Sequence, residues 1–207
     1  FSAVLGLNHA KTAILVVLVN PRAGGLLISG PQGIGKSTLM RSTQELIERP
    51  WRDIPVSVTE DRLFGTIDTE KAIYSGQKKL YPGIINEADQ GVLYLDDANL
   101  LREDLLDSIL NIAEVGAYQL ERDGLSLRCD TSFTVIAAIN PESGMLSGAC
   151  LDQFGLFVNV DNIHDENTRV EILKRTISFE KDCASFCKLC KLENEKIKKA
   201  IHSAMSL

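Results

Sequence analysis

Residues 30–38 read GPQGIGKST, and this stretch limits the possible folds of the chain more than any other. It fits the phosphate-loop pattern of a glycine, four residues, a second glycine, a lysine, and a serine or threonine. An apolar segment, LLIS, comes before it at 26–29, and the helix-like segment LMRSTQELIER follows it. A phosphate loop needs this context, because its amides and the positive end of a helix surround the anion together. The sequence therefore predicts a strand, a phosphate-binding turn and a helix.

Each residue type in the loop has a mechanical role in holding a polyphosphate. Gly30, Gly33 and Gly35 are expected to allow positive φ angles and a close approach of the backbone to an anion. We expect Lys36 to reach the β- and γ-phosphates of ATP and to assist catalysis, and the Ser37 hydroxyl to bind Mg²⁺. An accidental glycine-rich turn is the alternative, but it does not explain the strand and helix on either side. The predicted nucleotide-binding residues are Gly30, Pro31, Gln32, Gly33, Ile34, Gly35, Lys36, Ser37 and Thr38.

Two adjacent aspartates, Asp96 and Asp97, end the apolar segment VLYL at 92–95. Neighbouring carboxylates repel each other, so such a strand end needs a cation beside it. In a parallel sheet this end lies at the edge where α/β proteins bind their ligands. We expect Asp96 to hold Mg²⁺ through its water shell, and Asp97 to orient or deprotonate the attacking water. The alternative is a pair of solvated carboxylates that cap the helix predicted over 100–116.

Asn140 ends another apolar strand, FTVIAAIN, at 133–140. A polar amide at the same edge of the sheet can donate a hydrogen bond to the γ-phosphate or to the attacking water. We therefore place Asn140 with Lys36 and Asp97 among the candidate catalytic residues. Asn140-Pro141 also fits an ordinary Asn-Pro turn, so a purely structural role stays open.

The rest of the chain alternates short apolar segments with amphipathic ones. Uniformly apolar strands between helices predict a parallel sheet covered on both faces, which is an α/β architecture. The strands are expected at 26–29, 54–58, 92–95, 133–140 and 156–160. Helices are expected at 9–19 with Asn8 as the cap, from the phosphate loop to near Pro50, at 100–116 and at 165–181. A hairpin is expected at 118–129, turning at Asp123-Gly124.

Charge and hydropathy exclude several classes of protein. A net charge of −6 and a pI of about 5.1 argue against a nucleic-acid partner bound by a general basic surface. The longest apolar run, AILVVLV at 13–19, is too short for a membrane span and lacks the flanks of a signal peptide. Five cysteines in no regular framework favour a reducing compartment. We expect a cytoplasmic protein, and a piece of a longer one, since the chain begins with Phe1.

Beyond the phosphate loop, the chain resembles the AAA+ ATPases, and among them the ATPase (I) subunit of magnesium chelatase. The resemblance covers roughly residues 1–182, in the family's order. Its most particular parts are TEDRLFGTIDTEKA at 59–72 and LERDGLSLR at 120–128. The other matching segments are AVLGL (3–7), GPQGIGKST (30–38), PGIINEADQGVLYLDDANLL (82–101), AAINPESG (137–144) and LDQFGL (151–156).

The resemblance implies an architecture and an assembly. Residues 1–164 would form the AAA+ phosphate-loop domain, with a parallel five-stranded sheet, a helix-2 insert at about 66–85 and a hairpin before the sensor strand that ends at Asn140. Residues 165–207 would form a linker helix and the start of a helical lid, too short to show a second-sensor arginine. Family members form homo-oligomeric rings, usually hexamers, that bind ATP with Mg²⁺ and drive partner subunits that insert a metal into a tetrapyrrole. In family members, the adenine of the bound ATP contacts the backbone of the segment that corresponds to residues 3–7 of this chain.

Two positions depart from the family's pattern. Asp97 stands where a glutamate is usual, and a carboxylate about 1 Å short of its water can cost on the order of 10²-fold in rate. Gln153 stands where the family has the arginine finger, which acts on the γ-phosphate bound by a neighbouring subunit. Loss of such a finger lowers the turnover rate by about 10³- to 10⁵-fold. The sequence therefore predicts a subunit that binds ATP well and hydrolyses it slowly, or only when another subunit supplies an arginine. Two alternatives stay open: a nucleotide-gated regulatory or structural subunit with little turnover, and an AAA+ chaperone that remodels metalloproteins.

Cys183, Cys187 and Cys190 have the C-x₃-C-x₂-C spacing of the iron–sulfur motif in radical SAM enzymes. The same positions share one face of a helix, where cysteine commonly acts as a small buried hydrophobe. We favour the helix face, because nothing in the sequence predicts the barrel that radical SAM chemistry requires.

Overall fold

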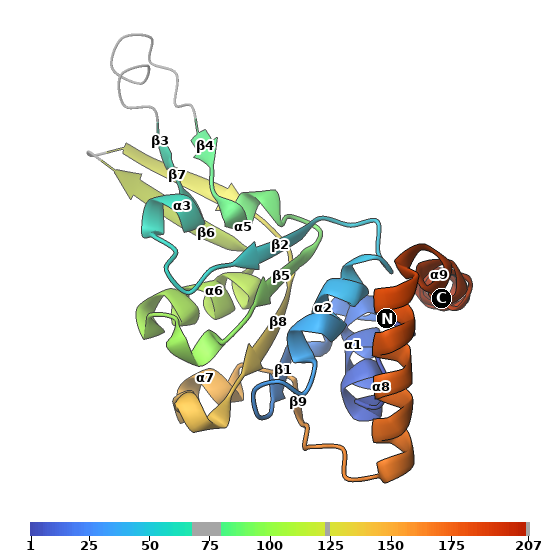
Figure 1. Ribbon diagram of the computed structural model, residues 1–207. Coiled ribbons are helices and arrows are strands. Elements are labelled where there is room, and N and C mark those ends of the chain that lie inside the picture. The colour runs from blue at the N-terminus through green and yellow to red at the C-terminus, as the bar shows by residue number, and fades with distance from the viewer. Residues whose placement is uncertain (68–79, 123–124, 206–207) are drawn as a thin grey trace.

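The computed structural model describes residues 1–67, 80–122 and 125–205. A five-stranded sheet with the order β2-β5-β8-β1-β9 lies at its centre, between layers of helices (Figure 1). Every pairing in this sheet is parallel, which confirms the predicted α/β architecture. Its strands are β1 (Leu26–Ser29), β2 (Trp51–Ile54), β5 (Val92–Leu95), β8 (Thr134–Ile139) and β9 (Leu156–Asn159).

The register of the sheet brings three strand ends to one edge. Ser29, the last residue of β1, pairs with Ile139 of β8, and Leu95 of β5 pairs with Ala137. Because β8 lies between β1 and β5, Asn140 emerges between the phosphate loop on one side and Asp96 on the other. The three segments that the sequence singled out therefore leave the same edge of the sheet.

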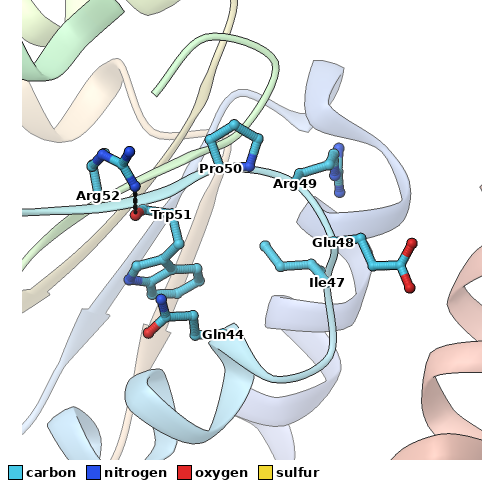
Figure 2. A pocket seen from close by; sticks show the side chains of 7 residues that line it. All are labelled: Gln44, Ile47, Glu48, Arg49, Pro50, Trp51 and Arg52. Atoms are coloured by element: carbon cyan, nitrogen blue, oxygen red, sulfur yellow. Dashed lines mark hydrogen bonds between the residues drawn. The ribbon is translucent and has the colours of Figure 1, made fainter. Parts of the chain in front are cut away.

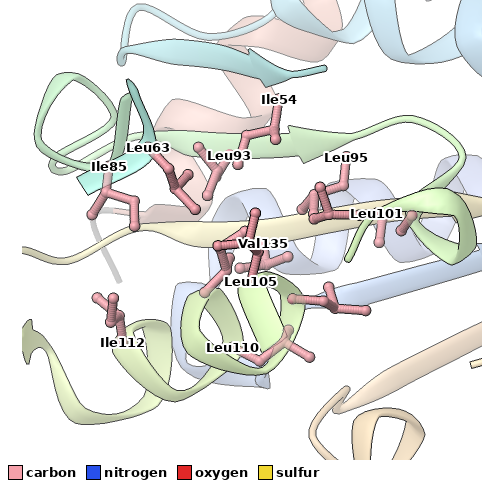
Figure 3. Packing of buried hydrophobic residues seen from close by; sticks show 14 of the residues in the cluster. Ile54, Leu63, Ile85, Leu93, Leu95, Leu101, Leu105, Leu110, Ile112 and Val135 are labelled. Atoms are coloured by element: carbon pink, nitrogen blue, oxygen red, sulfur yellow. The ribbon is translucent and has the colours of Figure 1, made fainter. Parts of the chain in front are cut away.

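Two apolar clusters hold the helices against the sheet. On one face, Leu93, Leu95 and Val135 pack against α6 (Glu103–Val115), α5 (Ile84–Glu87) and α3 (Glu60–Phe64), as Figure 3 shows. The other face packs against α1 (Asn8–Val19), α2 (Lys36–Gln44) and the end of α9 (Cys183–Met205). All residues of β1, β5 and β8 are buried, which explains why these strands are uniformly apolar.

Three details of the predicted elements are wrong. Asn8 does not cap α1 but is its first residue, and the preceding Leu7 adopts a left-handed conformation with φ 53°. The second strand is Trp51–Ile54 rather than 54–58. Pro55 has no N–H to donate to a neighbouring strand, so the strand ends before it. The helix α2 ends at Gln44, so it is shorter than predicted.

Two antiparallel pairs project together from the end of the sheet that carries α3 and α5 (Figure 1). The pair β6 (Ala117–Arg122) and β7 (Leu125–Asp130) confirms the predicted hairpin, while its turn at 123–124 lies outside the described residues. The pair β3 (Gly65–Ile67) and β4 (Leu80–Pro82) forms the base of the predicted insert. Most of that insert, at 68–79, also lies outside the described residues.

Tyr118 attaches the hairpin to the elements below it. Its hydroxyl oxygen lies 2.7 Å from the carbonyl oxygen of Phe64 and 2.6 Å from Oδ1 of Asn86. One hydroxyl proton cannot be donated to both, so the amide of Asn86 is better placed with its nitrogen toward Tyr118. Burial raises the pKa of Tyr118, and the neighbouring Cys129 adds to the rise.

We expect Tyr118→Phe to lower the free energy of unfolding by about 1–2 kcal/mol, because two hydrogen bonds are lost and the ring stays in place. The change is measured by urea denaturation, from the shift of the unfolding midpoint between two proteins with the same m-value. An unchanged midpoint would show that these hydrogen bonds add nothing to the hairpin's attachment.

The C-terminal part of the chain consists of two long helices, of which the second contacts both the first and α1 (Figure 1). The first, α8 (Glu166–Lys181), starts at Asp165, whose carboxylate accepts a hydrogen bond of 2.7 Å from the Thr168 amide. The second, α9, contacts the segment after α2 through a 2.9 Å ion pair between Lys198 and Glu48. No helix within the described ranges has the length and apolar character that a membrane span needs. The boundary at 164 between two domains remains a prediction.

Candidate nucleotide-binding site

The loop between β1 and α2 has the backbone that an anion cradle requires. Gly33 and Gly35 have φ angles of 85° and 92°, which L side chains rarely adopt. A Cβ built on either glycine would meet no atom within 4 Å, so the space beside the backbone is open. Gly30 differs from the expectation, since its φ is not positive. A Cβ there would lie 2.5 Å from the carbonyl oxygen of Val160, so Gly30 is required by close packing instead.

Lys36 is the first residue of α2, and its side chain turns back into the loop. Its Nζ donates hydrogen bonds of 2.6 Å to the Gly30 carbonyl and 2.9 Å to the Pro31 carbonyl. Burial lowers the pKa of Lys36, while the negative charges of Asp97 and Asp96 oppose that shift. The amine therefore lies inside the loop and within electrostatic range of both aspartates.

Ser37 and Asp96, the two predicted Mg²⁺ ligands, meet at one tyrosine hydroxyl. Tyr94 donates a 2.9 Å hydrogen bond to Oδ1 of Asp96. Burial raises the pKa of Tyr94, the charge of Asp96 adds to the rise, and a hydrogen bond from Ser37 opposes it. A carboxylate and a hydroxyl beside a phosphate loop are oxygen donors of the kind that Mg²⁺ prefers. The residues present therefore fit this ion.

Asp97 has a left-handed backbone, with φ 50° and ψ 49°. This conformation costs about 1–3 kcal/mol for most residues, and aspartate tolerates it better than most. Neither aspartate caps the helix that follows: α6 starts after Arg102, and the short helix at Ala98–Leu100 has no side-chain cap. The alternative role proposed for the two carboxylates is therefore absent here.

Asn140 forms the turn that the sequence also allowed. Its Oδ1 accepts a 3.1 Å hydrogen bond from the Glu142 amide, and its Nδ2 donates a 3.3 Å hydrogen bond to Ser143 Oγ. The carboxamide is buried at the sheet edge, and Nδ2 carries a second proton that this turn does not use. The turn is therefore compatible with a role toward a bound phosphate.

Asn99 is a site residue that the sequence analysis missed. Its Nδ2 donates to the carbonyls of Asn140 and Gly144, at 3.2 and 3.1 Å, and so joins the loop after β5 to the loop after β8. Its Oδ1 is buried and has no partner among the residues that the structure describes. A single asparagine after two aspartates gave no signal, because the loop it holds is more than 40 residues away in the sequence.

The remaining predicted positions lie around this site. Gln153 follows α7 (Gly148–Asp152), is half-buried, and donates only a weak 3.4 Å hydrogen bond to Ala149. In the segment expected near adenine, Val4 and Leu7 pack against the same apolar cluster as Ile34 of the loop. This segment is fixed from α8, where Arg175 donates to the carbonyls of Ser2 and Ala3.

A hollow of about 410 Å³ lies elsewhere, at the far end of α2 (Figure 2). It contains none of the predicted site residues, and it starts at Gln44, the last residue of the helix that Lys36 begins. We therefore do not assign it to the nucleotide. Its lining residues are Gln44, Ile47, Glu48, Arg49, Pro50, Trp51 and Arg52.

The three C-terminal cysteines lie on α9, and the expected burial is wrong for two of them. Cys183 and Cys187 are exposed, with their Sγ atoms 3.8 Å apart, and Cys190 is half-buried. In the part of the chain that the structure describes, no group of three His, Cys, Asp or Glu side chains is arranged to hold a metal ion.

This edge of the sheet brings together a glycine-lined phosphate loop, an acidic strand end and a polar strand end. Together they define a phosphate-loop nucleoside triphosphatase of the AAA+ class. The family profile of the AAA domain (dynein-related subfamily) matches residues 25–153. The chain belongs to this family. Its relatives include I subunits of magnesium chelatase.

The relatives match essentially the whole chain. The magnesium-chelatase 38 kDa subunit of Chlorobaculum tepidum is 33% identical over 100% of this chain and 63% of its own length. The magnesium-chelatase subunit ChlI homolog of Methanocaldococcus jannaschii is also 33% identical, over 100% of this chain and 67% of its own. The chain thus spans less than two thirds of the first of these relatives.

A solved structure agrees with the sequence matches. It is the complex between subunits BchI and BchD of magnesium chelatase, from single-particle cryo-electron microscopy. The matching chain has a TM-score of 0.72 and 33% identity, over 99% of this chain and 74% of that one. This similarity confirms the expected AAA+ fold.

Proposed function

We propose that this chain binds ATP with Mg²⁺ and hydrolyses it as the motor subunit of a complex like magnesium chelatase. One observation carries the proposal: the buried amine of Lys36 lies inside a phosphate loop, in the field of Asp96 and Asp97 at the next acidic strand end. An amine and a hydroxyl at a helix N-terminus, with two carboxylates at a strand end, match the parts that phosphoryl transfer uses.

In this mechanism the chain mainly positions and stabilises charge. The loop amides and Lys36 hold the phosphates. Ser37 and Asp96 would hold Mg²⁺, which when bound would neutralise charge on the γ-phosphate. Asp97 takes a proton from the attacking water, while the oxygen of that water bonds to the γ-phosphorus. The bond to the β-phosphate oxygen breaks, so that ADP and phosphate leave. Asn140 orients the water or the γ-phosphate through its free amide proton.

We further propose that hydrolysis is slow in the chain alone. Asp97 has a short side chain on a left-handed backbone that suits aspartate. Gln153 is neutral, whereas the arginine usual at this position would carry a positive charge to the nucleotide of a neighbouring subunit. Neither change removes a group that binds the phosphates, so affinity for ATP is retained while turnover is lost. A nucleotide-gated regulatory subunit is the second candidate, because Gln153 favours it.

The proposed assembly is a homo-oligomeric ring, usually a hexamer in this family, with chelatase-type partner subunits. The support is the family membership and the similarity to a chain of a two-subunit complex. A chaperone that remodels metalloproteins uses the same core and remains the third candidate. We also propose a cytoplasmic location on the basis of the composition.

The test is to measure ATP affinity and turnover with the purified chain. We expect Mg²⁺-dependent binding with turnover below about one per second, the low end of ordinary enzyme rates. Asp96→Asn is the control that should lose the Mg²⁺ dependence. Turnover of several per second would contradict the slow-hydrolysis proposal, and proteins that copurify with the chain distinguish a chelatase from a chaperone.

A further inference from the structure

We propose that the hydroxyl of Tyr94 is a positioning group that holds Asp96 and Ser37, the two protein ligands assigned to Mg²⁺, in place for the metal. The inference rests on the proposed function, because it names what fixes the metal-binding side chains of that site. The geometry that carries it is the 2.9 Å hydrogen bond from this hydroxyl to Oδ1 of Asp96. The hydrogen bond from Ser37, which opposes the rise in the pKa of Tyr94, brings the second ligand to the same hydroxyl.

The ring of Tyr94 is fixed before any metal binds. It lies on β5, only 5% exposed, in the apolar cluster on the side of the sheet that faces α2. Its centroid is 5.9 Å from that of Trp51, a residue of the neighbouring strand β2. A buried ring packed against Trp51 in this cluster has little rotamer freedom, so its hydroxyl stands at a fixed point beside Asp96.

A polar atom in this strand calls for an explanation. The other residues of β5 are apolar, and phenylalanine would fill the same volume. A buried hydroxyl needs a partner, and here the partner that accepts its proton is Oδ1 of Asp96, at 2.9 Å. The nearby Asp53 has another donor, since its Oδ1 accepts a 2.8 Å hydrogen bond from Trp51 Nε1.

This hydrogen bond orients the carboxylate without neutralising it. A hydroxyl is an uncharged donor, so Asp96 keeps its negative charge for the cation. Its Oδ1 is occupied by Tyr94, which leaves Oδ2 to face the water shell of the metal. The lone pairs of the same hydroxyl are available to the Ser37 side chain, so one atom sets both ligands. Groups that orient metal ligands in this way typically change metal affinity by about 10- to 100-fold when they are removed.

The test compares Tyr94→Phe with the wild-type chain. The probe is AMP-PNP, a non-hydrolysable ATP analogue, and its affinity is measured by calorimetry with saturating Mg²⁺ and again in EDTA. The ratio of the two affinities isolates the contribution of the metal. We expect Tyr94→Phe to bind as wild type in EDTA and to lose about tenfold of the Mg²⁺ enhancement.

Three further variants separate the possible outcomes. Tyr118→Phe loses a half-buried hydroxyl that bonds to Phe64 and Asn86 rather than to the site, so it should lose stability and keep the full Mg²⁺ enhancement. Asp96→Asn should lose the enhancement. Tyr94→Met also removes the hydroxyl, and it replaces Tyr94→Phe if that variant no longer binds in EDTA.

The outcomes distinguish this inference from the proposed function. If Tyr94→Phe keeps the wild-type enhancement while Asp96→Asn loses it, Tyr94 is not a positioning residue and the nucleotide site stands. If the wild-type chain binds no AMP-PNP, the proposed function is wrong and the inference fails with it.

Discussion

Lys36→Met is expected to lower ATP turnover by at least about 10²- to 10³-fold and to weaken nucleotide binding strongly, because it removes the positive charge inside the loop. Nζ already lies against the loop carbonyls of Gly30 and Pro31, so the amine is in place to move onto a phosphate. The measurement is ATP affinity and phosphate release under saturating Mg²⁺.

Loss of function in this variant should not come from unfolding. Burial lowers the pKa of Lys36, which means that the folded protein holds this charge at a cost. An apolar side chain of similar length removes that cost but also removes the donor to the Gly30 and Pro31 carbonyls, so we expect the free energy of unfolding to change by no more than about 1–2 kcal/mol. Lys198→Met is the matched control, because Lys198 pairs with Glu48 on the surface near α9 and should affect neither affinity nor turnover. Wild-type affinity in Lys36→Met would contradict the assignment of the loop.

The double change Asp97→Glu with Gln153→Arg is expected to raise turnover by about 10³-fold or more. A restored finger contributes about 10³ to 10⁵, and a correctly placed carboxylate about 10², so the arginine should dominate. Gln153 is half-buried and makes only one weak side-chain hydrogen bond, so arginine fits without loss of a buried partner. Turnover per chain is measured for both single variants and for the double.

Two controls make this experiment specific. Gln153→Met removes the amide without adding charge and should leave turnover at the wild-type level. A finger acts on the nucleotide of a neighbouring subunit, so the gain from Gln153→Arg should rise with protein concentration. Asp97→Glu should cost about 1 kcal/mol of stability, since glutamate tolerates a left-handed backbone less well. No gain in the double variant would show that other features limit hydrolysis.

The sequence predicted the elements that carry their own signal. Strands β1, β5 and β8 are buried on both faces and therefore uniformly apolar, so their positions could be read directly. The glycines that need a positive φ, Gly33 and Gly35, are those of a known loop pattern. The Gly116 stop of α6 was visible for the same reason, with φ 78° in the structure.

What the sequence could not give depends on contacts between distant segments. The strand at Trp51–Ile54 has two exposed central residues, Arg52 and Asp53, so its pattern does not look like a strand until it pairs with β5. Position 30 must be glycine because a Cβ there would collide with Val160, which is 130 positions away in the sequence. The loop pattern contains no information about this contact. Asn99 and Tyr94 matter only because the fold brings them beside Asn140 and Asp96. Such roles come from packing, which a local pattern does not record.

The central claim is that a polyphosphate binds in this loop and that a divalent cation links it to Asp96. The most direct measurement is equilibrium dialysis of the purified chain against labelled ATP, with Mg²⁺ and with EDTA. The account predicts saturable binding of a single nucleotide per chain, stronger with Mg²⁺, with that difference lost in Asp96→Asn. Absence of bound ATP under both conditions, or an Mg²⁺ effect that survives in Asp96→Asn, would contradict it.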